Sequence, residues 1–485
     1  MQLAKYVIYQ ARMREDEPAI AFAGGVATYG LLVKGVAASV EELRRLGLRR
    51  GDIVALHVQN PFHHAALILA LALTGQVSAS IMGRAQVEFS GVTPAVVLTD
   101  RADFELPGSR VVPLDDQWFV VDPGAPADYA GLLALPGFAD PGEVVRVVFS
   151  SGTTGYPKAV GMTLGALEQS CAHGEMTQAG PHQHAVRALN MMGFSTSASI
   201  MALLIALGRG GLLALASQPD EALRLIRAFR IEIAVSAVVQ LQGLLKALGG
   251  APPPTSLRTV IAAGARISPE LLLEARARLC PNLNVMYGST EGGPMTFGTG
   301  AALERHEGSA GYVLPWVAIE TVDTAGQRVP FGQDGVIRVK SAEQCFYLVP
   351  TPETDAMFRD GWFYPGDVGR LDADGLLSIT GRVNEVINRG GVIVAPDMVE
   401  EVLRSIAGVK DVAVFGAPDR AGVEEIWAAI VSDGWVDGAA IRQVAAVRLP
   451  DRAPDRIVQV DAIPRNEMGK IRRNQLRDSL TRREA

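Results

Sequence analysis

Residues 144–160 read VVRVVFSSGTTGYPKAV, and this stretch sets the interpretation of the whole chain. Its first half, Val144–Phe149, is rich in β-branched and aromatic residues, which predicts a buried strand. The second half combines hydroxyl groups, two glycines and a lysine. Glycines let the backbone turn tightly and approach a ligand, while hydroxyl, backbone N–H and ammonium groups suit a polyphosphate. We therefore predict a phosphate-binding loop at Ser150, Ser151, Gly152, Thr153, Thr154, Gly155 and Lys158.

The whole chain has 485 residues, too many for one hydrophobic core, so two or more domains are expected. It is 48% hydrophobic and 20% charged, as is typical of an α/β protein with many loops. The net charge of −7 provides no general basic surface for nucleic acid. The segment Met1–Arg14 lacks the apolar core of a signal peptide. The apolar runs Ala65–Leu73 and Ile200–Ala216 are predicted to be buried core segments, so no membrane span is expected.

The first part of the chain alternates predicted helices with predicted strands, a rhythm that favours a doubly wound sheet. These elements are the helices Leu31–Leu46 and His63–Leu73 and the strands Ile53–Val58, Val77–Ile81 and Ala95–Leu98. Neither the cysteines nor the first histidines have the spacing of metal ligands. We expect free thiols in a reducing cytoplasm and structural histidines at Cys171, Cys280, Cys345, His57, His63 and His64.

The glycine-rich loop is not a Walker A motif, because no Ser or Thr follows Lys158. Composition alone would also fit an ordinary flexible loop. The string resembles the phosphate loop of the adenylate-forming superfamily, which includes acyl- and aryl-CoA ligases, stand-alone adenylation enzymes and luciferases. Further segments resemble the signatures of that superfamily in the same order, between about Thr28 and Arg473. They are Tyr287-Gly288-Ser289-Thr290-Glu291, Gly366-Asp367, Gly381-Arg382 and Gly469-Lys470.

This resemblance implies a role for each matching residue. Tyr287 is expected to stack on adenine, Thr290 to hydrogen-bond the α-phosphate and Glu291 to hold Mg²⁺. Lys470 is the expected catalytic cation. Nucleotide and coenzyme A contacts are expected from Gly264, Ala265, Arg266, Gly288, Asp367, Arg382, Gly390 and Gly391. For the Gly-Gly pair, a tight turn explains the residues equally well.

In the superfamily the region around Asn190 lines a carboxylic-acid pocket and often carries an aromatic–His pair. Here Phe194 is followed by Ser195, so the histidine is missing. Methionines in this region also suit a packed core. The predicted lining is apolar with small residues, which favours an aromatic or medium aliphatic acid over a free amino acid. It comprises Met191, Met192, Phe194, Ser195, Ser236, Val239 and Ala263.

The implied fold is α/β, with a large multi-subdomain N-terminal domain at 1–381 and a small, mobile α+β C-terminal domain at 382–485. Asn384 occupies the hinge position. The implied reaction activates an acid with Mg-ATP to an acyl-adenylate, releases pyrophosphate and then, after the C-terminal domain rotates, forms a thioester with coenzyme A. Transfer to a carrier-protein phosphopantetheine or to an amine remains open. A nucleotide-binding regulator without catalysis is the alternative from another class.

Overall fold

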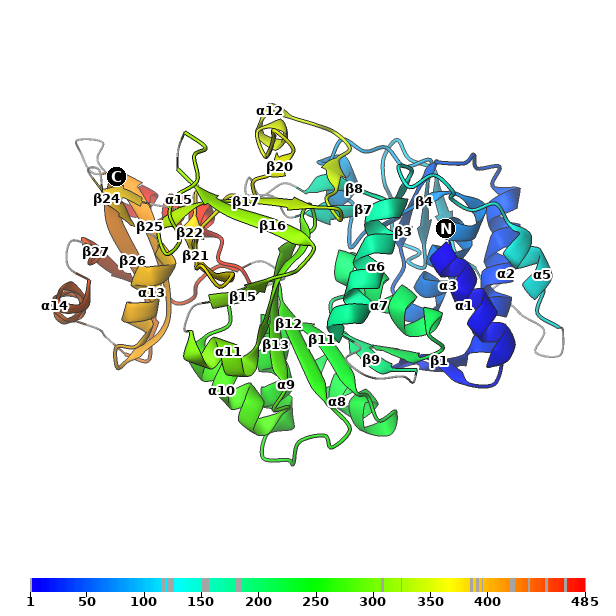
Figure 1. Cartoon of the computed structure of the whole chain (residues 1–485), viewed down its shortest axis with the longest axis horizontal. Coiled ribbons are helices and arrows are strands. Elements are labelled where there is room, and N and C mark those ends of the chain that lie inside the picture. Colours follow the sequence, from blue (N-terminus) through cyan, green and yellow to red (C-terminus); the bar gives the residue numbers. More distant parts are fainter. Residues whose placement is uncertain are drawn as a thin grey trace. The chain divides into compact units, whose positions relative to one another are not determined.

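The computed structural model (Figure 1) describes residues 2–115, 118–119, 126–150, 157–178, 185–306, 309–323, 325–383, 387–389, 392–394, 396–418, 424–434, 437–449, 452–465 and 469–484. The chain forms two compact units, each assembled from several segments. Unit 1 comprises Met1–Glu304, Leu314–Val317 and Lys340–Phe363, and unit 2 comprises Arg305–Val313, Ala318–Val339 and Tyr364–Ala485. The boundary at residue 381 stays a prediction.

The first sheet of unit 1 carries the predicted phosphate strand near its middle. Its order is β18-β8-β7-β4-β3-β5-β6, and the pairs β7/β8 and β8/β18 are antiparallel while the others are parallel. The strands are β3 (Ile53–His57), β4 (Val77–Ser80), β5 (Val96–Thr99), β6 (Val111–Pro113), β7 (Val144–Ser150), β8 (Lys158–Thr163) and β18 (Phe346–Tyr347).

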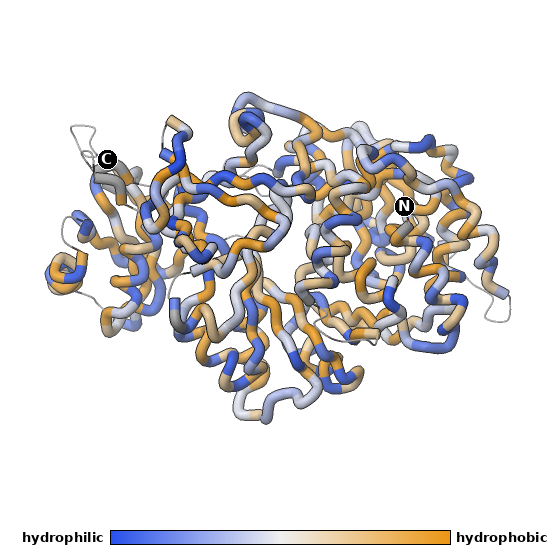
Figure 2. Tube along the Cα trace, in the orientation of Figure 1, coloured by the Kyte–Doolittle hydropathy of each residue, from blue (hydrophilic) through white to orange (hydrophobic). Residues whose placement is uncertain are grey.

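A second group of strands in unit 1 follows the order β14-β13-β12-β11-β9-β10-β1-β2. The strands from β13 to β1 run parallel, so their carboxyl ends share one edge. Figure 2 shows that β11–β13 are largely hydrophobic, as parallel strands covered on both faces must be. The strands are β1 (Pro18–Phe22), β2 (Gly25–Thr28), β9 (Arg187–Asn190), β10 (Leu212–Leu215), β11 (Ile233–Ala237), β12 (Thr259–Ala263), β13 (Leu283–Ser289) and β14 (Gly293–Thr299).

Several of the helices before α13 begin at a residue whose side chain caps the first turn. Asn60 accepts from the N–H groups of Phe62 and His63, and Ser268 accepts from Leu271 N–H. No helix among the described residues is both long and apolar enough to cross a membrane. The helices are α1 (Gln2–Met13), α2 (Tyr29–Arg45), α3 (Pro61–Thr74), α4 (Ala85–Glu88), α5 (Tyr129–Ala134), α6 (Leu164–Gln178), α7 (Ser197–Gly208), α8 (Pro219–Ala228), α9 (Val238–Leu248), α10 (Pro269–Arg278), α11 (Gly300–Arg305) and α12 (Pro352–Asp355).

Unit 2 contains a sheet of order β17-β21-β22-β15, with β16 paired to β17, and two smaller sheets near the end of the chain. The remaining strands and helices, including β19 and β20 of unit 1, are β15 (Ser309–Val313), β16 (Val317–Val322), β17 (Asp334–Ser341), β19 (Phe358–Arg359), β20 (Trp362–Phe363), β21 (Asp367–Leu371), β22 (Leu376–Arg382), β23 (Ile387–Arg389), β24 (Val392–Val394), α13 (Pro396–Arg404), β25 (Val409–Pro418), β26 (Glu424–Ser432), α14 (Gly438–Arg448), β27 (Arg456–Gln459) and α15 (Arg473–Glu484).

Strand β25 has a core on both of its faces. Val412 and Val414 pack in one hydrophobic cluster with residues of α13, whereas Ala413 and Phe415 pack in another with residues of α15. This is the alternation that a strand with a period of two residues requires. Helix α15 is therefore packed against one face of β25.

The α/β fold class is confirmed, and one boundary differs in an informative way. The stretch Ile233–Val239, whose valines and isoleucine favour a strand throughout, forms β11 only as far as Ala237, and α9 starts at Val238. Gln240 Oε1 accepts the Ala237 N–H at 2.8 Å, which closes the first helical turn. A side-chain cap therefore overrides the β-propensity of two consecutive valines.

Candidate active site

The predicted phosphate loop is framed by the antiparallel strands β7 and β8. Ser150, the last residue of β7, lies opposite Lys158, the first residue of β8. The Lys158 ammonium lies 5.8 Å from the ring centre of Tyr347. The remaining predicted loop residues lie outside the described part of the chain, as do the predicted hinge and the Gly-Gly pair: Ser151, Gly152, Thr153, Thr154, Gly155, Asn384, Gly390 and Gly391.

The predicted Tyr-Gly-x-Thr-Glu signature covers the end of β13, up to Ser289, and the start of the turn into β14. Gly288 is required there, because a Cβ atom would lie 2.5 Å from the carbonyl oxygen of Gly293. Ser289 Oγ accepts the Gly292 N–H at 3.0 Å and fixes the far side of the turn. Thr290 and Glu291 thus lie on a short, sterically defined turn.

Tyr347 connects this turn with the phosphate strand. Its hydroxyl donates to Glu291 Oε1 at 2.8 Å, and the neighbouring Cys345 N–H donates to the Glu291 carbonyl at 2.7 Å. Strand β18, which carries Tyr347, pairs with β8 two residues beyond Lys158. Burial, and then the Glu291 charge, raise the pKa of the Tyr347 phenol, which keeps it a neutral donor.

The Glu291 side chain has the donor chemistry for one magnesium ligand. The residue is only 7% exposed, and one carboxylate oxygen is engaged by Tyr347. No group of three or more His, Cys, Asp or Glu side chains that could hold a metal occurs in the part of the chain that the structure describes. A metal at Glu291 would therefore take most of its ligands from water and phosphate oxygens, as Mg²⁺ does in nucleotide sites.

The adjacent ends of β12 and β13 bring the predicted adenine contacts to one edge. Ala263 lies opposite Met286, so Gly264 and Tyr287 follow at neighbouring strand ends. Gly264 has a φ of 85°, a left-handed conformation that favours glycine. Ala265 and Arg266 continue this loop as exposed residues.

The predicted acid-pocket residues reach the same edge from β9, β11 and β12. Asn190 pairs with Val235, and Ser236 pairs with Ala262, so Met191, Ser236 and Ala263 lie at or next to neighbouring strand ends. Met191, Phe194 and Ser236 are buried, and Met192, Ser195 and Ala263 are partly exposed. Val239 lies on α9 and is 41% exposed. The structure therefore brings the predicted lining residues to the ends of β9, β11 and β12, and Val239, two residues beyond β11, is the most exposed of them.

In unit 2 the two predicted ribose contacts are direct neighbours. Asp367 on β21 lies opposite Arg382 on β22, and Arg382 Nε is 3.0 Å from Asp367 Oδ1. Asp367 is buried, so the arginine fixes the carboxylate orientation in a low-dielectric surrounding.

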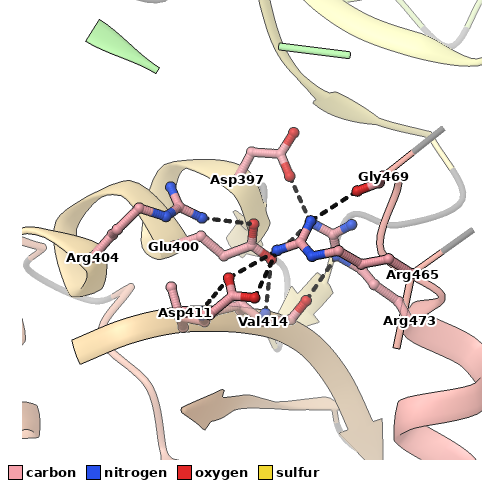
Figure 3. A network of polar contacts seen from close by, with 9 residues as sticks. Asp397, Glu400, Arg404, Asp411, Val414, Arg465, Gly469 and Arg473 are labelled. Carbon is pink, nitrogen blue, oxygen red and sulfur yellow. Dashed lines mark hydrogen bonds and ion pairs between the residues drawn. The ribbon is translucent and has the colours of Figure 1, made fainter. Parts of the chain in front are cut away.

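Arg465 fixes the glycine that precedes Lys470 in the sequence (Figure 3). Arg465 Nη1 donates to the carbonyl of Gly469 at 2.9 Å, while its Nη2 contacts both carboxylate oxygens of Asp411. Arg473 contacts Asp397 and Glu400 of α13 and the carbonyl of Val414 on β25. Gly469 has a φ of 79°. The predicted catalytic lysine therefore follows a left-handed glycine in a turn anchored to β25.

Comparison with known proteins agrees with this arrangement. The model of the AMP-binding enzyme family matches residues 8–345, and that of the AMP-binding enzyme C-terminal domain matches residues 398–470. A 2-succinylbenzoate–CoA ligase of Geobacillus kaustophilus is 30% identical over 94% of this chain and 94% of its own length. A fatty acid–[acyl-carrier-protein] ligase of Streptomyces coeruleorubidus is 27% identical over 98% and 96%. The structure of the amide bond synthetase McbA from Marinactinospora thermotolerans superimposes with a TM-score of 0.82 at 24% identity, covering 99% of both chains.

The first family model alone matches more than half of the chain, and the residues that it covers include β7, β8 and the Glu291 turn. The second model ends at Lys470. The chain belongs to the AMP-binding enzyme family, the adenylate-forming ligases.

Proposed function

We propose that this chain activates a carboxylic acid with ATP to give an acyl-adenylate and pyrophosphate, and then transfers the acyl group to coenzyme A. The observation that carries the proposal is the position of Tyr347 between Lys158 and Glu291. A triphosphate needs a cation and a metal-holding carboxylate at fixed places, and these two residues supply them beside the end of β7.

In the first step a carboxylate oxygen attacks the α-phosphorus, the new O–P bond forms, and the bond to the β-phosphate oxygen breaks. Both reactants are anions, so electrostatic repulsion dominates the barrier. We assign Lys158 to the outer phosphates and the Thr290 hydroxyl to the α-phosphate. Lys470 of unit 2 is assigned to the acid and the α-phosphate together. Mg²⁺, when held by Glu291, supplies positive charge against the leaving pyrophosphate.

In the second step the acceptor attacks the acyl carbonyl and AMP leaves. Coenzyme A is our first choice, since the 30% identical relative is named as a CoA ligase. A carrier-protein thiol and an amine are the alternatives, and relatives named for each acceptor exist. The apolar lining at Met191, Met192 and Phe194 favours an aromatic or medium aliphatic acid. The three free, buried cysteines fit a reducing cytoplasm, where ATP and coenzyme A occur.

Pyrophosphate release with Mg-ATP across a panel of aryl and aliphatic acids tests the proposal. Each acid is supplied without acceptor, with coenzyme A, or with a simple amine. Acid-dependent turnover that requires coenzyme A supports the ligase. Turnover with amine alone indicates amide synthesis, and a single burst without turnover indicates a carrier protein. Absence of release while ATP still binds would favour a nucleotide-binding regulator.

Two lysine variants of unit 2 serve as a matched pair in this assay. Lys470→Ala is expected to abolish acid-dependent release, because it removes the assigned cation. Lys410→Ala removes an exposed lysine paired with Asp433 and is expected to keep full activity. Full activity in Lys470→Ala would contradict the proposal.

A further inference from the structure

A buried arginine interrupts the apolar strand β7. Arg146 is 1% exposed, and its guanidinium donates to Ser78 Oγ at 3.0 Å, Ser80 Oγ at 2.9 Å and the carbonyl of Phe194. All three acceptors are neutral, and Nε has no partner among the residues that the structure describes. Burial lowers the pKa of Arg146 to about 10, so the group stays charged at neutral pH. Burying a cation without a carboxylate is costly, so its three directed contacts require an explanation beyond filling the core.

His64 fixes the direction of the hydrogen bonds around this arginine. Its Nδ1 lies 2.9 Å from the carbonyl of Val58, which can only accept, so Nδ1 carries the proton. Burial first, and then Arg146, lower the pKa of His64 to about 3, so the ring is neutral and Nε2 is an acceptor. Ser80, 2.7 Å away, must donate to Nε2 and presents its lone pairs to Arg146. The chain of bonds from Val58 to Arg146 has a single consistent polarity.

Phe194 contacts this network through both its main chain and its side chain. Arg146 binds its carbonyl, and the His64 ring lies 4.9 Å from its ring. The turn that carries Phe194 begins at Asn190, whose Oδ1 accepts the Met192 N–H at 2.7 Å. The position of this turn therefore depends on polar groups from β4, α3 and β7 as well as on its own strand.

We infer that Arg146 is a positioning residue for the acid pocket, which acts through Phe194 and determines which acids are accepted. The inference rests on the proposed function, because it takes Phe194 as a wall of that pocket. Arg146 donates hydrogen bonds to two serines of β4 and to one carbonyl of the turn, and these bonds limit the movement of that turn. Displacement of a pocket wall by about 1 Å changes the rate by up to about 100-fold.

The first test compares Arg146→Met with Val147→Ala by measuring kcat and KM for several acids and for ATP. Arg146→Met keeps an unbranched side chain but removes all three hydrogen bonds. Val147→Ala removes core contacts at the next, fully buried position of the strand. We expect Arg146→Met to raise the KM of the preferred acid about 10- to 100-fold and to reduce its advantage over a one-methylene analogue, with the KM of ATP unchanged. Val147→Ala should leave selectivity intact. Equal losses for every acid, or an equal rise in the KM of ATP, would overturn the inference.

The second test does not require turnover. Hydrogen–deuterium exchange of peptides spanning residues 187–199 should accelerate in Arg146→Met but not in Val147→Ala. Unchanged exchange in this segment would overturn the positioning role. If the wild type shows no acid-dependent pyrophosphate release, the proposed function and the selectivity claim fail, whereas exchange still decides the positioning role.

A second variant covers the case in which Arg146→Met does not fold. Ser80→Ala removes one acceptor of Arg146 and the donor to His64, with a smaller change in volume. We expect it to change the same acid KM values and the same peptides, by smaller factors. Selectivity and exchange equal to the wild type in Ser80→Ala would overturn the inference.

Discussion

Arg473, three residues beyond Lys470, ties the start of α15 to α13 and β25, and Arg473→Met should weaken unit 2 markedly. Arg473 Nη2 lies 2.6 Å from Asp397 Oδ1 and 2.7 Å from Glu400 Oε1, and Nε donates to the Val414 carbonyl at 3.0 Å (Figure 3). Glu400 is 4% exposed, so its carboxylate loses most of its compensation when Arg473 is removed. Breaking such a buried pair typically costs about 3–5 kcal/mol. Asp397 is more exposed and adds little.

The expected loss depends on pH in a defined direction. Burial raises the pKa of Glu400 to about 7, although Arg473 and the Val414 N–H oppose that rise. A carboxyl group with a raised folded-state pKa stabilises the fold fully below its unfolded pKa, and that contribution is lost as pH rises through the folded-state value. Removing Arg473 raises the pKa of Glu400 further. The penalty of Arg473→Met should therefore grow between about pH 6 and pH 8.5.

Hydrogen–deuterium exchange of peptides from β25 and β26 measures this penalty locally, which avoids treating a chain of two units as two-state. Arg404→Met is the matched control, because Arg404 lies 3.9 Å from Glu400 and is 42% exposed. We expect the control to change the opening free energy by less than about 1 kcal/mol. The reasoning would be refuted if Arg473→Met lowered the opening free energy by less than about 1 kcal/mol at pH 8.5, or if its effect on that free energy did not depend on pH.

Three further substitutions test individual contacts. Tyr347→Phe removes the donor to Glu291 and should lower kcat for acid-dependent pyrophosphate release about 10- to 100-fold. This factor corresponds to about 1.5–3 kcal/mol for a hydrogen bond to a charged group. An unchanged kcat would contradict the role of Tyr347. Gly288→Ala places a Cβ atom 2.5 Å from a carbonyl oxygen of the facing strand, so the KM of ATP should rise, and wild-type kinetics would show that the turn adapts freely. Asp411→Ala removes the carboxylate bound to Arg465 and should lower kcat while leaving the KM of ATP unchanged, and a kcat equal to that of the wild type would contradict a link through Arg465 to the lysine.

Local sequence patterns predicted those parts of the fold and site that depend on neighbouring residues. The predicted helix at residues 63–73, for example, lies within α3, which is capped by short-range hydrogen bonds from Asn60. The α/β class and the family were also predicted correctly, because several short signatures occur along the chain in the order of the superfamily. Strand ends of a parallel sheet meet at one edge, which is why Gly264 and Tyr287 become neighbours.

Contacts between distant segments could not be predicted in this way. Tyr347 joins Glu291 to the phosphate strand only because β18 pairs with β8, and no periodicity or motif marks a strand of two residues. Arg146 is visible in the sequence as one charge in an apolar run, but its partners come from β4 and from the turn after β9. Such roles depend on strand pairing at long sequence separation, which local propensity does not encode.

The most direct test of the central claim follows an oxygen atom. An acceptable acid labelled with ¹⁸O in its carboxylate is incubated with Mg-ATP and the acceptor, and the phosphorus products are analysed by mass spectrometry. Attack of the carboxylate on the α-phosphorus predicts pyrophosphate without label and AMP carrying one ¹⁸O atom, with no label transfer in Lys470→Ala. Formation of ADP with labelled inorganic phosphate, or of unlabelled AMP only, would contradict adenylate formation by this chain.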